Sequence, residues 1–260
     1  MAAFHLSKWY LDYVTDSGDA SIVYVGDLRW GPVHLHYSSL LRSVVNDVAQ
    51  RNSLRRPSMP ELKGSSISWS SAPLDFAAVW QADSTEIRET VFKNEEGSVE
   101  WRCLMPRAQV RAGGDSGLGY VEHLTMTVAP WKIPIQHLRW GRFCSASDWA
   151  VWIDWEGEFS KRILYLNGRS VPVSPISSTI ADEQIIFDDG SRLTMDRSLT
   201  LRKGPLGTSA LSSIPGVGKT FPARLLQVDE CKWRSRARFE RPGRSPVEGW
   251  AIHEIVSWPK

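Results

Sequence analysis

Hydrophobic and polar residues alternate along most of the chain with a period of two, which is the pattern of β-strands that bury one face. In residues 148–156, for example, Trp149, Val151, Ile153 and Trp155 fall on one face, and mostly acidic residues take the other. Similar runs occupy residues 8–15, 20–30, 33–41, 74–82, 86–93, 98–112, 120–129, 163–167, 183–188, 192–202, 223–231 and 232–239. So many short alternating segments predict an all-β protein built from antiparallel strands, as a barrel or a sandwich.

Turn-forming residues separate many of these runs. Asn167-Gly168 stands between two alternating segments and is the strongest hairpin signal, because both residues tolerate positive φ. Residues 16–19, 94–97 and 188–190 have a similar turn composition. Only residues 40–52 have a pattern that could form a short helix. Residues 51–66 and 203–222, rich in glycine and proline, are expected to be loops.

The second half of the chain repeats a short motif of the first half. Gly119-Tyr120-Val121-Glu122-His123 recurs as Gly249-Trp250-Ala251-Ile252-His253, an offset of 130 positions (249 − 119) in a chain of 260. A repeat of this length indicates a duplicated domain, although matches this short also arise by chance. We therefore expect an N-terminal β-domain over residues 1–130 and a C-terminal β-domain over 131–260. Pro130 and Pro134 interrupt the strand pattern at this boundary.

The composition is that of a globular protein with an excess of tryptophan. Hydrophobic residues make up 42% of the chain, charged residues 23%, and the net charge is only +2. A charge so close to zero gives no reason to expect nucleic acid as a partner. There are 13 tryptophans against 8 phenylalanines and 6 tyrosines. Such large flat rings suit a pocket for a bulky apolar ligand, and they equally suit the core of a β-barrel.

The cysteines and the apolar segments indicate the cellular compartment in which the protein is expected. Cys103, Cys144 and Cys231 are odd in number and far apart, so neither a disulfide framework nor a thiolate zinc site is expected. The first ten residues lack the features of a secretory signal, and no apolar run is long enough to span a membrane. We expect a cytoplasmic protein with no integral membrane segment and no cofactor. The oligomeric state is left open.

Three further patterns suggest a binding site, namely a phosphate-binding loop, a metal site and a row of basic residues, but each has a simpler interpretation. Gly216-Val217-Gly218-Lys219-Thr220 resembles the end of a phosphate-binding loop, yet it lacks the first glycine of that motif and is followed by Phe221-Pro222. His34 and His36 share one strand face and could chelate a metal, but no acidic residue follows closely as a third ligand. We therefore expect no metal site and two histidines on an outward face.

A comb of basic residues near the C-terminus could contact phosphate groups. Its members alternate at every second position and continue into the following turn: Lys232, Arg234, Arg236, Arg238, Arg241 and Arg244. This spacing is typical of the solvated face of a strand, where charge also prevents association of sheet edges. We therefore expect the comb to face solvent.

Glu122 is the candidate for acid chemistry. Neighbouring residues of a strand point to opposite faces, so Tyr120 shares a face with Glu122 while His123 lies on the other. A carboxyl group among aromatic rings tends to have a raised pKa and can then act as a general acid. Arg139 follows within 20 residues and could orient or simply neutralise it. Asp148 and Asp154, which lie on one face of a later strand with Trp152, form a second acidic group.

Taken together, these features resemble a known family. The junction Gly117-Leu-Gly-Tyr120-Val-Glu122-His123, leading through Pro130-Trp131 to Leu138-Arg-Trp140-Gly141-Arg-Phe143, is similar to hydroxyneurosporene synthase (carotenoid 1,2-hydratase) and AttH-like proteins. The resemblance implies two lipocalin-like antiparallel β-barrel domains in tandem. It also implies hydratase chemistry, or the pericyclic cyclisation of some relatives, on a hydrophobic ligand. The short second half with its arginine-rich end departs from the family pattern.

The resulting prediction is a protein that binds a largely apolar unsaturated molecule, such as a terpenoid, carotenoid or polyketide. It would catalyse acid-assisted hydration or cyclisation, with Glu122 as the acid and Tyr120 and Arg139 orienting it. His123, Trp131, Trp140, Trp152 and Asp154 are the predicted ligand-binding residues, and the aromatic rings would stabilise a carbocation. A pocket that only holds one reactive conformer is a second mechanism. The alternatives are a non-catalytic lipocalin-like carrier and a structural module with no cavity.

Overall fold

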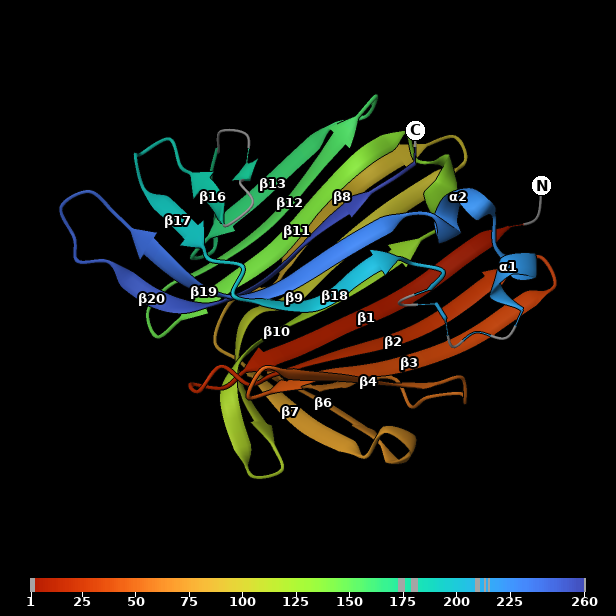
Figure 1. Cartoon of the computed structure of the whole chain (residues 1–260), viewed down its shortest axis with the longest axis horizontal. Helices are drawn as coiled ribbons and strands as arrows, with labels where there is room; N and C mark the ends of the chain where they lie inside the picture. The colour runs from red at the N-terminus through yellow and green to blue at the C-terminus, as the bar shows by residue number, and fades with distance from the viewer. Residues whose placement is uncertain are drawn as a thin grey trace. The chain divides into compact units, whose positions relative to one another are not determined.

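The chain folds into two compact all-β units. The computed structural model describes residues 3–172, 176–178, 182–208, 211–212, 214 and 216–259. The units are Met1–Ile133 and Pro134–Lys260, and each is built on one ten-stranded sheet (Figure 1). Every strand pairing within the described residues is antiparallel, for example β1 with β2 and β11 with β12. The predicted all-β antiparallel fold is therefore confirmed.

The first unit forms a ladder in the order β4-β3-β2-β1-β10-β9-β7-β6-β5, with β8 paired to β9. The ladder begins at β4 and ends at β5, and β1 and β10 form its centre. The strands are β1 (Phe4–Val14), β2 (Ala20–Trp30), β3 (Val33–Val44), β4 (Asp47–Ser53), β5 (Glu61–Lys63), β6 (Ser66–Ser71), β7 (Phe76–Ala82), β8 (Ile87–Asn94), β9 (Gly97–Ala112) and β10 (Asp115–Met126).

The second unit repeats this order strand for strand, as β14-β13-β12-β11-β20-β19-β17-β16-β15, with β18 paired to β19. The two copies of the glycine–aromatic–histidine motif lie in β10 and β20, which occupy the same place in the two ladders. The strands are β11 (Ile135–Ser145), β12 (Trp149–Gly157), β13 (Lys161–Leu166), β14 (Arg169–Ser170), β15 (Ser177–Ser178), β16 (Glu183–Ile186), β17 (Arg192–Met195), β18 (Leu199–Pro205), β19 (Asp229–Glu240) and β20 (Val247–Ser257).

The helices are short. They are the 3₁₀ turns η1 (Ala72–Leu74) and η2 (Pro130–Lys132) and the α-helical turns α1 (Val217–Thr220) and α2 (Ala223–Leu226). The glycine–lysine motif at residues 216–220 thus ends in a four-residue helix. Among the described residues there is no helix whose length and apolar character would let it cross a membrane.

The helix suggested for residues 40–52 is wrong. This segment is the hairpin of β3 and β4, in which Ser43 pairs with Val48 and Val44 with Asp47. Val45 and Asn46 form its turn with φ of 48° and 69°. Val44 ends β3, Val45 lies in the turn and Val48 belongs to β4. The hairpin predicted at Asn167-Gly168 is confirmed, with φ of 49° and 84° at the turn joining β13 to β14.

Each sheet buries a core on one of its faces. In the first unit Leu11, Val23, Val25 and Val121 alternate along β1, β2 and β10 and pack around Trp80. In the second unit the corresponding core contains Phe143, Trp152, Leu193 and Phe239. The other face of each sheet is also largely buried, because Tyr10 and Tyr120 of the first unit and Val151 and Ile252 of the second are covered as well. Because these strands are buried on both faces, a polar side chain within them is shielded from water. It therefore needs a hydrogen-bond or ion-pair partner in the protein.

The basic comb is only half exposed, so its prediction as a solvated face is corrected. Arg236 and Arg238 are exposed, but Lys232 is 1% exposed and Arg234 is 7% exposed. The Lys232 ammonium pairs with Glu254 and lies 3.8 Å from Glu230. Acidic partners on β20 and at the start of β19 make this burial possible, since a buried charge requires compensation. Period-two spacing did not reveal these partners.

We predict that Gly141→Ala destabilises the second unit by about 1–3 kcal/mol, the usual cost of overpacking a core. Gly141 pairs with Trp152 across β11 and β12, and a Cβ at Gly141 would overlap the indole ring. Gly114→Ala is the matched control, because a Cβ there meets nothing within 4 Å. Denaturant unfolding of both variants measures the difference. Equal stability of the two variants would contradict the packing described here.

Candidate functional site

Glu122 is buried at the centre of the first sheet and receives two short hydrogen bonds. Its side chain is 7% exposed and faces the same way as Tyr120, as the sequence predicted. The Trp101 indole N–H donates to Glu122 Oε2 at 2.6 Å, and the Tyr120 hydroxyl donates to the same oxygen at 2.6 Å. Both donors hold one oxygen of the carboxyl group in a fixed position. Trp101, which comes from the neighbouring strand β9, is not among the site residues that the sequence predicts.

The local ladder explains why these groups meet. Glu122 pairs with Tyr10 of β1 and with Cys103 of β9, so Trp101 stands two residues from the direct partner of Glu122 on the same face. Register shifts in the β9–β10 pairing on either side of Val121 mark a bulge at this point. Bulges re-aim side chains and are frequent beside functional groups. Alternation in the sequence places Trp101 and Cys103 on one face of β9. Only the β9–β10 register shows that Glu122 lies on this face as well.

Tyr120 is held as a protonated hydrogen-bond donor. Burial, together with the neighbouring Cys103 and Glu122, keeps the pKa of Tyr120 well above its ordinary value of 10.0. Further rings lie on this face: Tyr10 makes edge-to-face contacts with Tyr120 at 5.9 Å and with Tyr24 at 5.3 Å between centroids. The result is one buried carboxyl group surrounded by aromatic rings, which we call the Glu122 site (Trp101, Tyr120 and Glu122).

The second unit does not repeat the Glu122 site. The residue that takes the place of Glu122 in β20 is Ile252, which pairs with Arg142 of β11 and Arg234 of β19. Arg142 is fully buried and donates to the Trp250 carbonyl oxygen at 3.1 Å, and the Arg234 guanidinium lies 4.9 Å from the Trp250 ring centre. The position of the Glu122 carboxyl group is therefore apolar in the second unit, where the neighbouring strands contribute arginines beside it.

His123 lies on the opposite face from Glu122, beside the first core. Its imidazole stacks on Trp9 at 4.6 Å between centroids, and Ser7 Oγ lies 2.8 Å from His123 Nε2. Burial, with the positive charges of Arg102 and His5, lowers the pKa of His123 to about 4. A neutral imidazole results at physiological pH. His123 and Glu122 therefore belong to two different faces of β10.

Arg139 and Asp154 are brought together in the second unit, where they face each other across β11 and β12. Arg139 donates to Glu156 Oε1 at 2.8 Å, so its described contacts give no support to the predicted role of orienting Glu122. Asp154 is buried and pairs with Arg162 at 3.1 Å. Burial raises the pKa of Asp154 in spite of Arg162 and Arg139.

The three predicted ligand-binding tryptophans occupy three different environments. Trp131 lies in η2 and packs edge-to-face on Trp30 and Phe4. Trp140 is buried on β11 with the Lys232 ammonium 5.3 Å from its ring centre. Trp152 is part of the second core. Trp140 and Gly141 are neighbours in β11, and Gly141 pairs with Trp152, so Trp140 and Trp152 lie on opposite faces of the sheet.

A serine–histidine–glutamate chain is buried in the second unit. Ser235 Oγ lies 2.8 Å from His253 Nε2, and His253 Nδ1 lies 3.0 Å from Glu183 Oε2. The order resembles a nucleophile, a base and an orienting acid. All three side chains are 0% exposed, and Arg197 completes the group with an ion pair to Glu183 at 3.3 Å. Because these three side chains are enclosed, we assign them a structural role. Their hydrogen bonds join β16, β19 and β20. Sequence reasoning had noted His253 alone.

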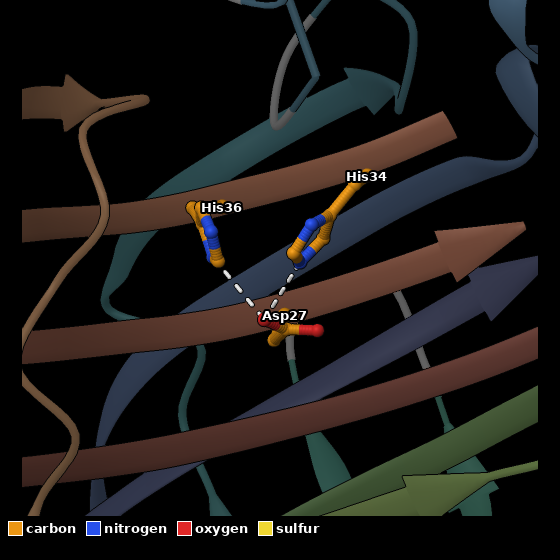
Figure 2. A group of neighbouring side chains, drawn as sticks. All are labelled: Asp27, His34 and His36. Carbon is orange, nitrogen blue, oxygen red and sulfur yellow. Dashed lines mark hydrogen bonds and ion pairs between the residues drawn. The ribbon is translucent and has the colours of Figure 1, made fainter. Parts of the chain in front are cut away.

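One group of residues offers the donors of a metal site. Asp27 on β2 and His34 and His36 on β3 each place one ligand atom within 4.8 Å of the others (Figure 2). The acidic partner stands before the histidines in the chain, on the neighbouring strand, rather than after them. The expectation of two outward histidines is therefore corrected for His36, which is half-buried.

A surface groove of about 430 Å³ lies over β5, β6 and β7. Its lining includes Met59, Trp69, Val79 and Arg111, and Glu122 is not among its lining residues. Polar groups contribute a large part of this lining, since Ser58, Glu61, Ser68 and Ser70 also border it. The groove is thus distinct from the Glu122 site.

Comparison with known proteins supports the fold. No family model matches the sequence, and no curated protein matches it significantly. Among solved structures, kievitone hydratase from Nectria haematococca superposes with a TM-score of 0.58 at 12% identity, covering 96% of this chain and 88% of that one. CghA gives 0.57 at 10% identity over 98% and 88%, and a protein described as an AttH from Nitrosomonas europaea gives 0.57 at 10% over 99% and 94%. These likenesses show the tandem lipocalin-like fold alone.

We predict that His123 stays neutral in the folded protein until the pH falls to about 4. Its pKa is lower in the folded state than the unfolded value of 6.5, so the unfolded chain takes up the proton first. The contribution of His123 to stability is then complete above pH 6.5 and is lost as the pH falls from 6.5 to about 4. An NMR titration of the ring measures it, with the urea-unfolded protein as control. A native pKa near 6.5 would contradict the prediction.

We predict that Glu183→Gln lowers the free energy of unfolding by about 3–5 kcal/mol at neutral pH, because it removes the buried negative charge that pairs with His253 and Arg197. Burial alone would raise the pKa of Glu183, but His253 and Arg197 lower it below the ordinary value of 4.5. The stabilisation is thus present above pH 4.5 and is lost as the pH falls through the lower, folded value. Unfolding of wild type, Glu183→Gln and the exposed control Glu248→Gln across this range tests it. A variant as stable as the control at pH 7 would refute the structural role.

Proposed function

We propose that the protein binds a largely apolar, unsaturated small molecule and catalyses an acid-assisted reaction at its double bond, with Glu122 as the acid. The observation that carries the proposal is the carboxyl group of Glu122, which is buried among aromatic rings and fixed by two donors on one oxygen. Carboxyl groups are seldom buried to this degree, and ionisable groups in such surroundings concentrate at functional sites. The fold shared with kievitone hydratase is consistent with this proposal.

In the hydration reaction, Glu122 transfers its proton to one alkene carbon and the other carbon becomes cationic. Water then adds to that carbon and returns a proton to the Glu122 carboxylate, so one C–H and one C–O bond form and the double bond becomes single. Since Trp101 and Tyr120 both donate to Oε2, we assign the transferred proton to Oε1. The two donors stabilise the carboxylate that remains after transfer.

The aromatic rings on this face have a second role in the proposal. Tyr10, Tyr24 and Tyr120 form a chain of edge-to-face contacts on the same face as Glu122. An aromatic face attracts a cation with about 0.5–2 kcal/mol when water is excluded, so these rings would stabilise the carbocation. They replace Trp131, Trp140 and Trp152, which the sequence had suggested for this role. The protonated Tyr120 also keeps the Glu122 side chain in one orientation.

Ring closure is the second candidate reaction, supported by the resemblance of the sequence to a family that includes cyclases. The same protonation would start it, and an internal alkene would replace water as the nucleophile. A pocket that only restricts the conformers of its ligand would achieve closure without the acid. Hydration adds one water to the mass of the ligand, whereas cyclisation leaves the mass unchanged.

The competing function is that of a carrier, and one experiment separates the two. The protein is purified from its producing cells, and the bound compound is extracted and identified by mass spectrometry. That compound is then incubated in ¹⁸O-labelled water with wild type, Glu122→Gln and the exposed control Glu95→Gln. A hydratase incorporates the label, a cyclase gives an unlabelled isomer, and a carrier returns the compound unchanged.

We predict that Glu122→Gln lowers turnover at least about a hundredfold, in the range expected for loss of a general acid. The amide keeps the size of the side chain and can still accept from Trp101, so binding of the extracted compound should remain within a few-fold of wild type. Glu95→Gln should match wild type in both. Equal turnover by Glu122→Gln and wild type would exclude Glu122 as the acid.

A further inference from the structure

Two histidines and an aspartate converge on one point of the first sheet. The carboxylate oxygen Asp27 Oδ2 lies 3.1 Å from His34 Nε2 and 3.2 Å from His36 Nδ1. Figure 2 shows the two rings on β3 directed at the carboxylate on β2. The pairing register explains the approach, because Asp27 faces His36 directly and the next position on the same face of β3 is His34.

The polar atoms of this cluster are not satisfied by hydrogen bonds alone. His36 Nδ1 is buried and makes no hydrogen bond to any residue that the structure describes, although it lies close to the Asp27 carboxylate. If this nitrogen carries no proton, its lone pair faces a carboxylate oxygen, and the arrangement is repulsive unless a cation lies between the two.

We infer that Asp27, His34 and His36 form a binding site for a divalent transition-metal ion of the zinc class. In a tetrahedral zinc site with metal–ligand distances of about 2.0–2.1 Å, neighbouring ligand atoms lie about 3.3–3.4 Å apart. The two distances to Asp27 are already within 0.3 Å of that value, at 3.1 and 3.2 Å. The two imidazole nitrogens lie within 4.8 Å of each other, close enough to share one ion.

The donor set determines which ion the site takes. Two imidazoles and one carboxylate suit zinc, copper and nickel, whereas magnesium and calcium prefer oxygen ligands throughout. Three protein ligands leave the fourth position of the ion open to water or to another small ligand, as in catalytic zinc sites. Arg29 Nε binds the other carboxylate oxygen, Asp27 Oδ1, at 3.3 Å and so orients the carboxylate with Oδ2 toward the histidines.

The site is open to solvent and separate from Glu122. β4 pairs with β3 only from Ser38 onward, so the histidines stand on a stretch of β3 that β4 does not cover in the described ladder. The exposed fractions of the side chains are 49% for His34, 19% for His36 and 14% for Asp27. Asp27 pairs with Ser7 and therefore lies on the face of His123, opposite to Glu122. A test of metal binding at this site is therefore independent of the test of Glu122 as the acid.

Calorimetric titration of the untagged, metal-free full-length protein with ZnCl₂ tests the inference, with MgCl₂ as the comparison ion. We expect one Zn²⁺ per chain at saturation and no response to Mg²⁺. His36→Gln and Asp27→Asn each remove one ligand and should weaken Zn²⁺ binding at least about tenfold, the lower end of what loss of a supporting group costs. His137→Gln, in the second unit, is the matched control and should bind as wild type does.

A second readout guards against variants that fail to fold. Zn²⁺ should raise the melting temperature of wild type and of His137→Gln by mass action and leave that of Asp27→Asn unchanged. His34→Gln alters the most exposed of the three ligands and should melt normally without metal, yet bind Zn²⁺ at least about tenfold more weakly. Absence of saturable Zn²⁺ binding by wild type would overturn the inference. Equal affinity of wild type, Asp27→Asn and His36→Gln would also overturn it.

Discussion

The register of the central antiparallel pairings, β1 with β10 and β11 with β20, determines on which face of its sheet each side chain of these strands lies. Successive residues of a strand point to opposite faces, so once the register is set, Glu122 and His123 must separate although they are adjacent in sequence. On one face the register gathers Tyr10, Tyr120 and Glu122; on the other it gathers Trp9, Ser7 and His123. A slip of one residue would exchange the two sets.

The strand order that the two units share shows how one scaffold supports different polar groups. Both units have the same strand order, and both place a histidine of the repeated motif against a tryptophan and a serine. In the second unit Glu183 adds a charged partner and encloses the histidine completely. On the opposite face Ile252 takes the place of Glu122, and its strand partners in the second unit are Arg142 and Arg234. Conserved backbone pairing with altered side chains is what duplication followed by divergence produces.

The sequence predicted the features that depend on local pattern. Alternation identified the strands, Asn167-Gly168 identified a hairpin, and the spacing of Tyr120 and Glu122 placed both on one face. The sequence did not predict contacts between residues that are distant in the chain. Trp101 meets Glu122 only through the β9–β10 register, and Asp27 meets His36 only through β2 and β3. Lys232 is buried because Glu254 and Glu230 accompany it, which the comb of basic residues could not reveal.

The central claim is that Glu122 acts on the double bond of an apolar ligand, and a crystal structure of the protein with its co-purified compound tests this most directly. Our account predicts that an unsaturated carbon of the compound lies within about 3–3.5 Å of the Glu122 carboxyl group, the separation of reacting atoms before attack. The rings of Tyr10 or Tyr120 should be in contact with the same part of the ligand. A compound bound in the groove over β5–β7, or one with its unsaturated carbons remote from Glu122, would contradict the account.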